Sequence, residues 1–243
     1  LTSIIIPELV TSIGNNAFLA SSLTTATVNY DRLGDTNFPA DIGAGQTIGG
    51  KPGVLIIGYN IPSDLTVFYK ATDNTSVNIS GSLTSANFPS GYTVSNITQV
   101  AIGNTVTSIG DSTFRDATSL TTVTFEAGST LTTIGIYAFK KTGITNFNIP
   151  NTVTTIGKFS FQETGITSII IPNSVTDISG AFYQTSDLSS VIFEAGSTLT
   201  SIGEWTFLQS ALTSIIIPNS VTSIGEYAFS ETSSLTSVAF ETG

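Results

Sequence analysis

The sequence predicts a mostly β protein built as a stack of similar coils, with short irregular or 3-10 segments between its strands. Three observations predict this solenoid: a motif that recurs, constant apolar places within the motif, and length changes that fall, with one exception, in two loops. Apart from one interval of 74 residues, the spacing of successive units is 22 to 24 residues. The units open at Leu1, Leu23, Ile97, Leu120, Ile144, Ile166, Leu188, Leu212 and Leu235.

Each unit begins with the pattern L-x-x-I-x-I, which predicts a short strand whose first, fourth and sixth side chains face inward. Proline ends several of these strands, because it has no N–H to give to a sheet. A second pattern, V/L-T-x-I-G-x-x-A-F, follows after a loop. We expect its glycine to relieve a tight bend and its phenylalanine to fill the core on the opposite wall.

A single unit is too small to fold alone. It offers about six inward apolar side chains, each contributing roughly 1.5–3 kcal/mol on burial. Ordering its roughly 22 residues costs about 1–2 kcal/mol per residue. Only neighbouring coils above and below can supply the missing burial and hydrogen bonds, so the units must stack.

The full motif, L-x-x-I-x-I-P-x-x-V-T-x-I-G-x-x-A-F, recurs in residues 1–30 and 97–243 and resembles the BspA-like leucine-rich repeat family. The resemblance implies a right-handed leucine-rich repeat solenoid with a parallel β-sheet on one wall. It also implies an exported or cell-surface protein used in adhesion and protein binding. The family often has a cysteine three residues after the phenylalanine. This sequence has small residues there instead, which keep the packing: Ser21, Ala117, Thr142, Thr164, Thr185, Ser210 and Thr232.

Three parts are expected along the chain: repeats in 1–30, an irregular β-rich insertion in 31–96, and further repeats in 97–243, of which the last is incomplete. Within the insertion, residues 54–59 and 65–69 read as strands joined by turn residues 60–64, which predicts a β-hairpin. Degenerate repeats that continue the stack are the second interpretation. The insertion also holds all three N-x-S/T glycosylation sequons, at Asn74, Asn78 and Asn96.

The composition excludes several classes of function. The chain has no histidine and no cysteine, which removes the serine triad with histidine, the cysteine nucleophile, and zinc, haem and iron–sulfur sites with their usual ligands. Seven Lys+Arg against 17 Asp+Glu give a net charge of −10, which argues against nucleic acid and anionic membranes as partners. No apolar run is long enough for a membrane-spanning helix. We therefore expect no enzyme, no metal and no cofactor.

The remaining polar clusters fit the solvent or the repeat better than they fit a catalytic site. Asp31, Asp35 and Asp41 could gather around calcium, but their spacing does not match an EF-hand loop. Glu126, Glu194 and Glu241 occupy equivalent places in successive long loops, which indicates a structural role. Tyr137 and Trp205 read as isolated surface aromatics without a function.

The informative surface is the outward face of the strands, formed by the third and fifth residues of L-x-x-I-x-I. None of the 18 residues at these positions is charged. Such a face suits contact with a protein or a glycan, in which shape and area count for more than charge. A ladder that only stabilises the sheet is the competing interpretation. The candidate partner-binding residues are Asn146, Asn148, Ser168, Ile170, Ser190, Ile192, Ser214 and Ile216.

The sequence thus predicts a non-catalytic extracellular or cell-surface module for binding or adhesion, with a protein or glycan ligand and no membrane insertion. The alternative is a structural component of an appendage, coat or virus particle. In that case self-association would use the solenoid ends, which lack the polar caps that solenoids need.

Overall fold

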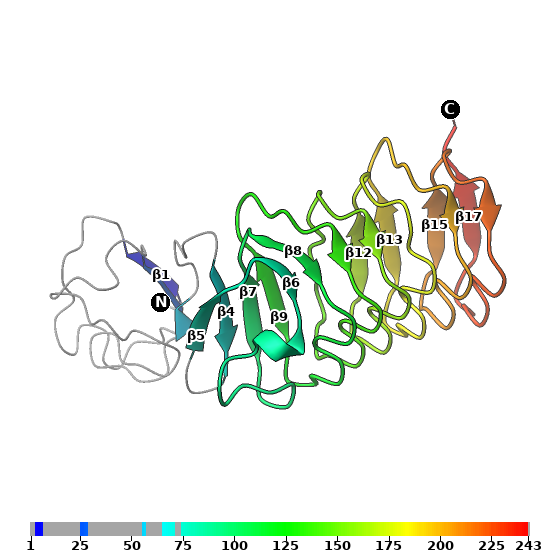
Figure 1. Cartoon of the computed structure of the whole chain (residues 1–243). Helices are drawn as coiled ribbons and strands as arrows, with labels where there is room; N and C mark the ends of the chain where they lie inside the picture. The colour runs from blue at the N-terminus through cyan, green and yellow to red at the C-terminus, as the bar shows by residue number, and fades with distance from the viewer. Residues whose placement is uncertain (1–2, 7–24, 29–54, 57–64, 71–73, 243) are drawn as a thin grey trace, which may run out of the picture.

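The computed structural model describes residues 3–6, 25–28, 55–56, 65–70 and 74–242. Within these ranges the regular structure is β apart from one 3-10 helix, η2 (Ser85–Asn87), and no helix there is long and apolar enough to cross a membrane. The coils from β4 (Leu65–Tyr69) to β17 (Ser237–Phe240) stack into an elongated solenoid with the C-terminus beside β17 (Figure 1).

One side of the solenoid, the strand wall, carries the L-x-x-I-x-I strands. Its strands are β7 (Gln99–Ile102), β9 (Thr122–Phe125), β12 (Ser168–Ile171), β13 (Ser190–Phe193), β15 (Ser214–Ile217) and β17. Parallel pairs join β7 to β9, β12 to β13 and β15 to β17. Near the N-terminus, β1 (Ser3–Ile6), β2 (Thr25–Val28) and β3 (Leu55–Ile56) form another parallel sheet.

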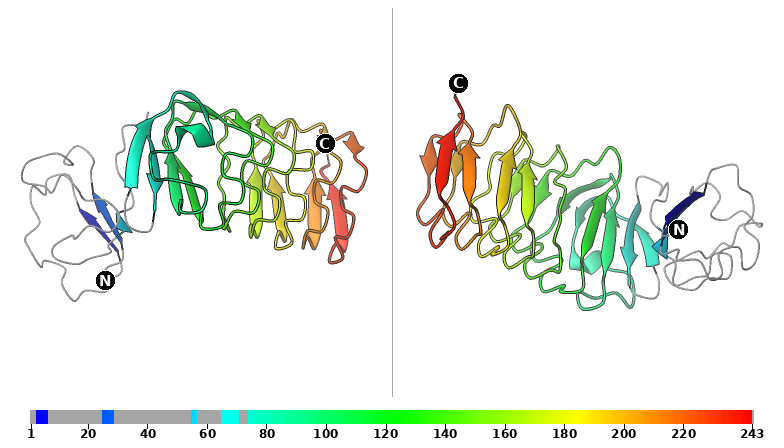
Figure 2. Two further views of the ribbon diagram at one scale, coloured as in Figure 1. Left: turned by 60° about the horizontal axis from the view of Figure 1, so that its bottom comes forward. Right: turned by 180° about the vertical axis from the view of Figure 1, so that it is seen from behind.

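A second wall is built from the T-x-I-G part of each unit. It contains β6 (Gly81–Leu83), β8 (Val106–Ile109), β10 (Thr133–Ile134), β11 (Thr155–Ile156), β14 (Ser201–Ile202) and β16 (Ser223–Ile224), paired in parallel in the order β6-β8-β10-β11 and β14-β16. Figure 2 shows the repeated coils from two further sides. The repeat register is kept on both walls, as in Ile169 opposite Val191 and Ile134 opposite Ile156.

Phenylalanine rings form a continuous column through the core. Rings of adjacent coils lie 5.4–5.8 Å apart between centroids with interplanar angles of 6–25°. The column comprises Phe88, Phe114, Phe139, Phe161, Phe182, Phe207 and Phe229. Phe139, Phe161 and Phe207 are fully buried, which confirms that the phenylalanines are the large core fillers.

In the described coils, the small residues three places after each column phenylalanine from Phe114 to Phe229 are buried, and most of them are hydrogen-bonded. The hydroxyl of Thr142 donates to the carbonyl of Phe139 at 3.0 Å, and that of Thr164 to Phe161 at 2.9 Å. The hydroxyl of Thr185 also donates to the Phe161 carbonyl, at 3.1 Å. A threonine in the place of cysteine therefore fills the space and ties the turn after the phenylalanine to the backbone.

The glycine that follows the isoleucine of the second wall is required by close packing of neighbouring coils. A Cβ atom on Gly157 would lie 2.7 Å from backbone atoms of Gly135 and Ile136, and one on Gly225 would lie 2.5 Å from the Glu204 nitrogen. The φ angles of these glycines are not positive. The expected reason, relief of a tight bend, is therefore wrong, because contact between coils and not local bending excludes a side chain here.

Two residues per coil adopt the left-handed conformation, two and six places after this glycine position. Tyr137 and Lys141 have φ angles of 57° and 56°, and Trp205 and Gln209 have 59° and 60°. The coil that is one residue shorter places Gly180 at φ 63° instead of the aromatic residue. The first bend turns the chain between the second wall and the column phenylalanine, and the second bend turns it after that phenylalanine.

The predicted β-hairpin is present with a different partner strand. β4 pairs antiparallel with β5 (Asn74–Asn78), whereas Leu55 and Ile56 of β3 pair in parallel with β2. The pairing of residues 54–59 with 65–69 is therefore wrong. The prediction fails because each strand has other partners. β3 continues the parallel sheet of β1 and β2, and β4 lies between β5 and β7, antiparallel to both.

After the hairpin the chain resumes coiling. Leu83 of β6 lies opposite Ile109, and Phe88 stacks on Phe114. Residues 81–88 therefore carry both the second-wall strand and the column phenylalanine, although the sequence motif is not recognisable there.

Candidate functional site

The eight candidate partner-binding residues all lie on the outward face of the strand wall. Asn146, Asn148, Ser168 and Ser214 are exposed, and Ser190 is half-buried. The three isoleucines are 51%, 56% and 60% exposed at Ile170, Ile192 and Ile216, respectively. Because residues alternate along a strand, their neighbours Ile169, Val191 and Ile215 are buried. The wall thus presents a row of exposed isoleucines flanked by serines.

The outward face differs from expectation at its β4 end. Ala101, the fifth residue of its unit, is buried, and Gln99 is half-buried. Ala101 lies opposite Val67 of the hairpin strand β4 and forms a small cluster with Val67 and Tyr69. The open part of the wall therefore begins after β7.

The strand wall is interrupted at residues 144–149, between β9 and β12. The side chains there still alternate, with Phe147 and Ile149 buried and Asn146 and Asn148 exposed. No backbone hydrogen bond joins 144–149 to either neighbouring coil in the described structure. At equivalent places, the amides of Thr121 and Ser189 donate to the preceding coil at 2.9 Å, whereas Thr145 does not. This segment is therefore an unpaired strand.

Two features of the sequence accompany the interruption. Phe147 stands where other coils have isoleucine, valine or alanine, and its ring lies 5.1 Å from that of Phe139 and 4.9 Å from that of Phe161. The larger side chain is packed into the phenylalanine column, and the asparagine on both sides of it has low strand propensity. A second break lies between β13 and β15, where Ile215 takes the place of Phe147. Both breaks follow a coil with the longer loop, 125–131 or 193–199.

A groove of about 710 Å³ lies over this unpaired strand. It is lined by Thr121, Thr122, Val123, Thr145, Asn146, Phe147, Asn148, Ser168, Ile169, Ile170 and Ile192. All eleven residues are uncharged, and five of them are candidate partner-binding residues. The groove thus brings candidate residues from three coils of the strand wall around one hollow.

The side chains of the groove have hydrogen-bonding capacity to spare. The Asn146 amide donates only to the Thr145 hydroxyl, at 3.3 Å, and the Asn148 amide makes no hydrogen bond in the described structure. An asparagine amide carries two donors and an acceptor, so both residues can pair with a ligand.

The three sequons differ in accessibility. The amide nitrogen of Asn74 is buried, and that of Asn96 donates to the Gly91 carbonyl at 2.8 Å. Asn78 is exposed. A glycan attaches to this amide nitrogen, and glycosylation of the three sequons stays a prediction.

Carboxylates in the long loops support neighbouring coils. The Glu194 carboxylate accepts from the backbone N–H of Asn173 at 3.2 Å, and that of Glu241 accepts from the backbone N–H of Asn219 at 3.4 Å. Burial raises the pKa of Glu126 above its ordinary value of 4.5. No group of three metal-ligating side chains occurs among the residues that the structure describes, and Asp31, Asp35 and Asp41 lie outside them.

Sequence reasoning missed an aromatic ladder on the turn side, and the interpretation of Tyr137 and Trp205 as isolated is wrong. At the left-handed positions, Tyr137 stacks on Phe159 of the next coil at 5.2 Å, and Phe159 stacks on Trp205 at 6.2 Å across the coil that has Gly180 there. The Lys158 ammonium lies 4.2 Å from the Trp205 ring centroid and 3.5 Å from a Glu204 oxygen. The signal in the sequence was that Tyr137, Phe159 and Trp205 stand at equivalent positions of their repeat units.

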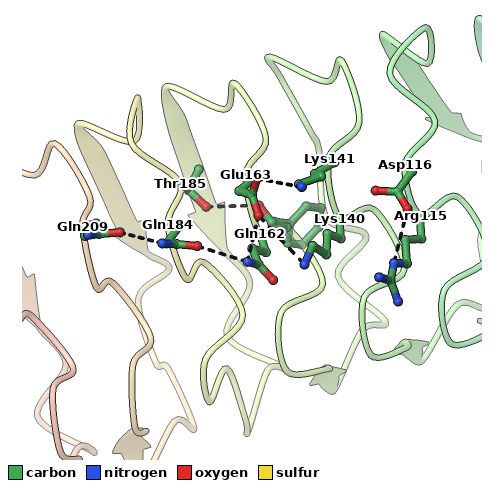
Figure 3. A network of polar contacts seen from close by, with 10 residues as sticks. Arg115, Asp116, Lys140, Lys141, Gln162, Glu163, Gln184, Thr185 and Gln209 are labelled. Atoms are coloured by element: carbon green, nitrogen blue, oxygen red, sulfur yellow. Dashed lines mark hydrogen bonds and ion pairs between the residues drawn. The ribbon is translucent and has the colours of Figure 1, made fainter.

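Next to this ladder runs a network of polar side chains (Figure 3). The Gln162 amide donates to Gln184 at 3.1 Å, and Gln184 donates to Gln209 at 2.8 Å. Lys141 pairs with Glu163 at 3.3 Å. The groups on this side satisfy one another across coils, so they stabilise the stack and leave little capacity for a ligand.

Comparison with known proteins supports the architecture. A family model described as BspA type leucine rich repeat region matches the chain in six copies, over residues 1–39, 64–184 and 154–243. A leucine rich cell surface protein from Faecalibacterium prausnitzii is similar in structure, with a TM-score of 0.50 and 22% identity over 99% of this chain and 48% of that one. A leucine-rich repeat protein from Eubacterium ventriosum has a TM-score of 0.42 and 24% identity over 96% of this chain and 64% of that one.

The chain thus spans about half the length of the first of these proteins and less than two thirds of the second. At these identities the similarity to the Faecalibacterium protein shows the fold alone. No curated protein matches the chain.

Proposed function

The chain belongs to the BspA-type leucine-rich repeat family, and from this membership and the geometry of its strand wall we propose that it is a non-catalytic protein-binding module. Its contact surface is the outward face of β9 to β15, centred on the groove over residues 145–148. The observation that carries this proposal is the row formed by Ile170, Ile192 and Ile216, each more than half exposed beside an uncharged groove.

The strand wall exposes aliphatic surface to solvent at Ile170, Ile192 and Ile216. Neighbouring exposed isoleucines form an apolar patch that monomeric proteins seldom leave uncovered without a function. The flanking serines, threonines and asparagines supply the hydrogen-bonding rim that protein interfaces need. The turn side, by contrast, uses its polar groups within the molecule.

We also propose that the protein is exported to the cell surface and acts there in adhesion. Support comes from the family and from the structural neighbour named as a leucine rich cell surface protein. Protease treatment of intact cells from the source, followed by detection with an antibody, should remove the protein. Survival of the protein in intact cells and its loss only after lysis would refute the location.

Lysine substitution tests the wall as the contact surface. The variant changes Ser168, Ile170, Ser190 and Ile192 to lysine and is measured on immobilised extracellular-matrix proteins and on whole cells. We expect binding to be lost, because four buried ammonium groups at an interface are costly to desolvate. A matched control changes four exposed serines outside the wall to lysine: Ser119, Ser186, Ser233 and Ser234. Unchanged binding of the wall variant would refute the proposal.

A second candidate function is structural assembly through the solenoid ends. Such an assembly would cover Val238 and Phe240 of β17, which are 45% and 60% exposed. Sedimentation over a range of concentrations tests it. Growth of long assemblies that Phe240→Lys abolishes would favour this function, and a monomer at every concentration would exclude it.

A further inference from the structure

We infer, on the basis of the proposed function, that the groove over residues 145–148 binds an uncharged segment of polypeptide in an extended conformation. The main chain of that segment would pair with the side-chain amides of Asn146 and Asn148. The inference goes beyond the wall as a contact surface, because it names the ligand chemistry and the two residues that recognise it.

The two asparagines match the chemistry of a peptide unit. A peptide group offers one N–H donor and one carbonyl acceptor, and an asparagine amide offers the complementary acceptor and donor in one plane. Asn148 makes no hydrogen bond in the described structure, and Asn146 makes only one, of 3.3 Å. Both side chains are exposed and can turn toward a ligand.

The spacing of the two asparagines matches an extended chain. They are two residues apart on an extended segment, so their Cα atoms are about 6.6–6.8 Å apart. Alternate residues of a bound strand repeat at the same distance. A ligand lying along the groove segment could therefore meet both amides with equivalent peptide units, over about four of its own residues.

The backbone of residues 144–149 is also not paired with the sheet. Residues 144–149 make no hydrogen bond to β9 or β12, so their N–H and carbonyl groups are not consumed by the sheet. Main-chain groups of this kind need water or a ligand as a partner. A peptide supplies such donors and acceptors without introducing charge.

The lining selects against two other ligand classes. Its eleven residues carry no charge, so an acidic or basic segment would lose hydration without gaining an ion pair. The only aromatic residue of the lining, Phe147, is 7% exposed and its ring contacts Phe125, Phe139 and Phe161. No ring face is left for stacking on a sugar, whereas Ile170 and Ile192 can take an aliphatic side chain. The volume lies within the roughly 300–1,000 Å³ that is common for ligand pockets.

A phage-displayed library of random dodecapeptides, selected on the whole chain, tests the inference. We expect enrichment of uncharged peptides rich in β-branched residues. Binding of a selected synthetic peptide is then measured by calorimetry on Asn146→Ala/Asn148→Ala, with an expected loss of tenfold or more. The matched control, Asn151→Ala/Asn219→Ala, removes two exposed asparagines of loops outside the groove and should bind the peptide like the unchanged protein.

The outcomes separate this inference from the proposed function. Selected peptides that bind Asn146→Ala/Asn148→Ala unchanged, yet are lost with the four-lysine wall variant, would overturn the role of the amides and leave the wall intact. The peptide would be overturned as the ligand if no peptide is selected and the protein binds a neutral oligosaccharide on an array, with that binding lost in Asn146→Ala/Asn148→Ala. Peptide binding unaffected by either variant would overturn both proposals. Circular dichroism of each variant verifies its fold.

Discussion

The phenylalanine column gives a quantitative prediction for Phe161→Ala. The Phe161 ring is fully buried and lies 5.6 Å from Phe139, 5.5 Å from Phe182 and 4.9 Å from Phe147. Truncation of a buried phenylalanine costs about 3–5 kcal/mol of unfolding free energy. Since stacked aromatic pairs add about 0.5–1.5 kcal/mol each, we expect the loss to lie near 5 kcal/mol.

The assay is urea denaturation followed by circular dichroism, with Phe229→Ala as the matched control. Phe229 is half-buried and stacks on Phe207 at 5.5 Å, with no further ring of the described column beyond it. Its truncation should cost about 1–2 kcal/mol, since only part of a side chain's burial is lost. Phe161→Leu should lose about 1 kcal/mol, because volume is largely kept. Equal losses for Phe161→Ala and Phe229→Ala would refute the cooperative column.

Three further predictions follow from other contacts. Gly157→Ala should lose about 2–3 kcal/mol of unfolding free energy in the same assay, because its Cβ would lie 2.7 Å from the Gly135 backbone. In Gly165→Ala the nearest atom to the new Cβ would be 3.4 Å away, so this variant should lose less than about 1 kcal/mol. Equal losses would contradict the close approach of the coils. Lys158→Met should change the fluorescence of Trp205, the single tryptophan, since the ammonium lies 4.2 Å from its ring, and should lower the free energy by no more than about 1 kcal/mol. An unchanged spectrum would contradict this contact. Burial raises the pKa of Glu126, so the folded protein keeps a proton on this carboxyl that the unfolded chain releases as the pH rises through 4.5. The free energy of unfolding therefore falls across that pH window. Glu126→Gln should raise the urea midpoint at pH 7 and not at pH 3, and the reverse order would contradict the sign.

The constant apolar positions of the repeat determine most of the architecture. Ile169, Val191 and Ile215 alternate with exposed residues as the motif predicts, and Phe139, Phe161 and Phe207 stack as the recurring phenylalanine indicates. These features depend on one unit meeting a copy of itself. The sequence of one repeat unit is therefore enough to predict which side chains are buried and how neighbouring coils stack.

What the sequence did not reveal depends on differences between copies. The hairpin partner of β4 was misassigned because residues 54–59 and 65–69 have equally good strand patterns, and pairing is decided by neighbouring strands. The aromatic ladder depends on left-handed φ angles at Tyr137 and Trp205, where a motif shows only a variable position. The groove lies where Phe147 replaces a smaller residue between two asparagines, and the pattern of the motif does not show that the sheet is interrupted at this coil.

Amide hydrogen exchange by NMR at Thr145 and Thr121 tests the account most directly. The two threonines occupy equivalent, exposed positions of adjacent coils, but only the Thr121 amide donates a hydrogen bond, to the Thr98 carbonyl at 2.9 Å. We predict fast exchange at Thr145, Asn146 and Asn148 and slow exchange at Thr121. Slow exchange at all four amides would show a continuous strand wall without the groove and would contradict the account.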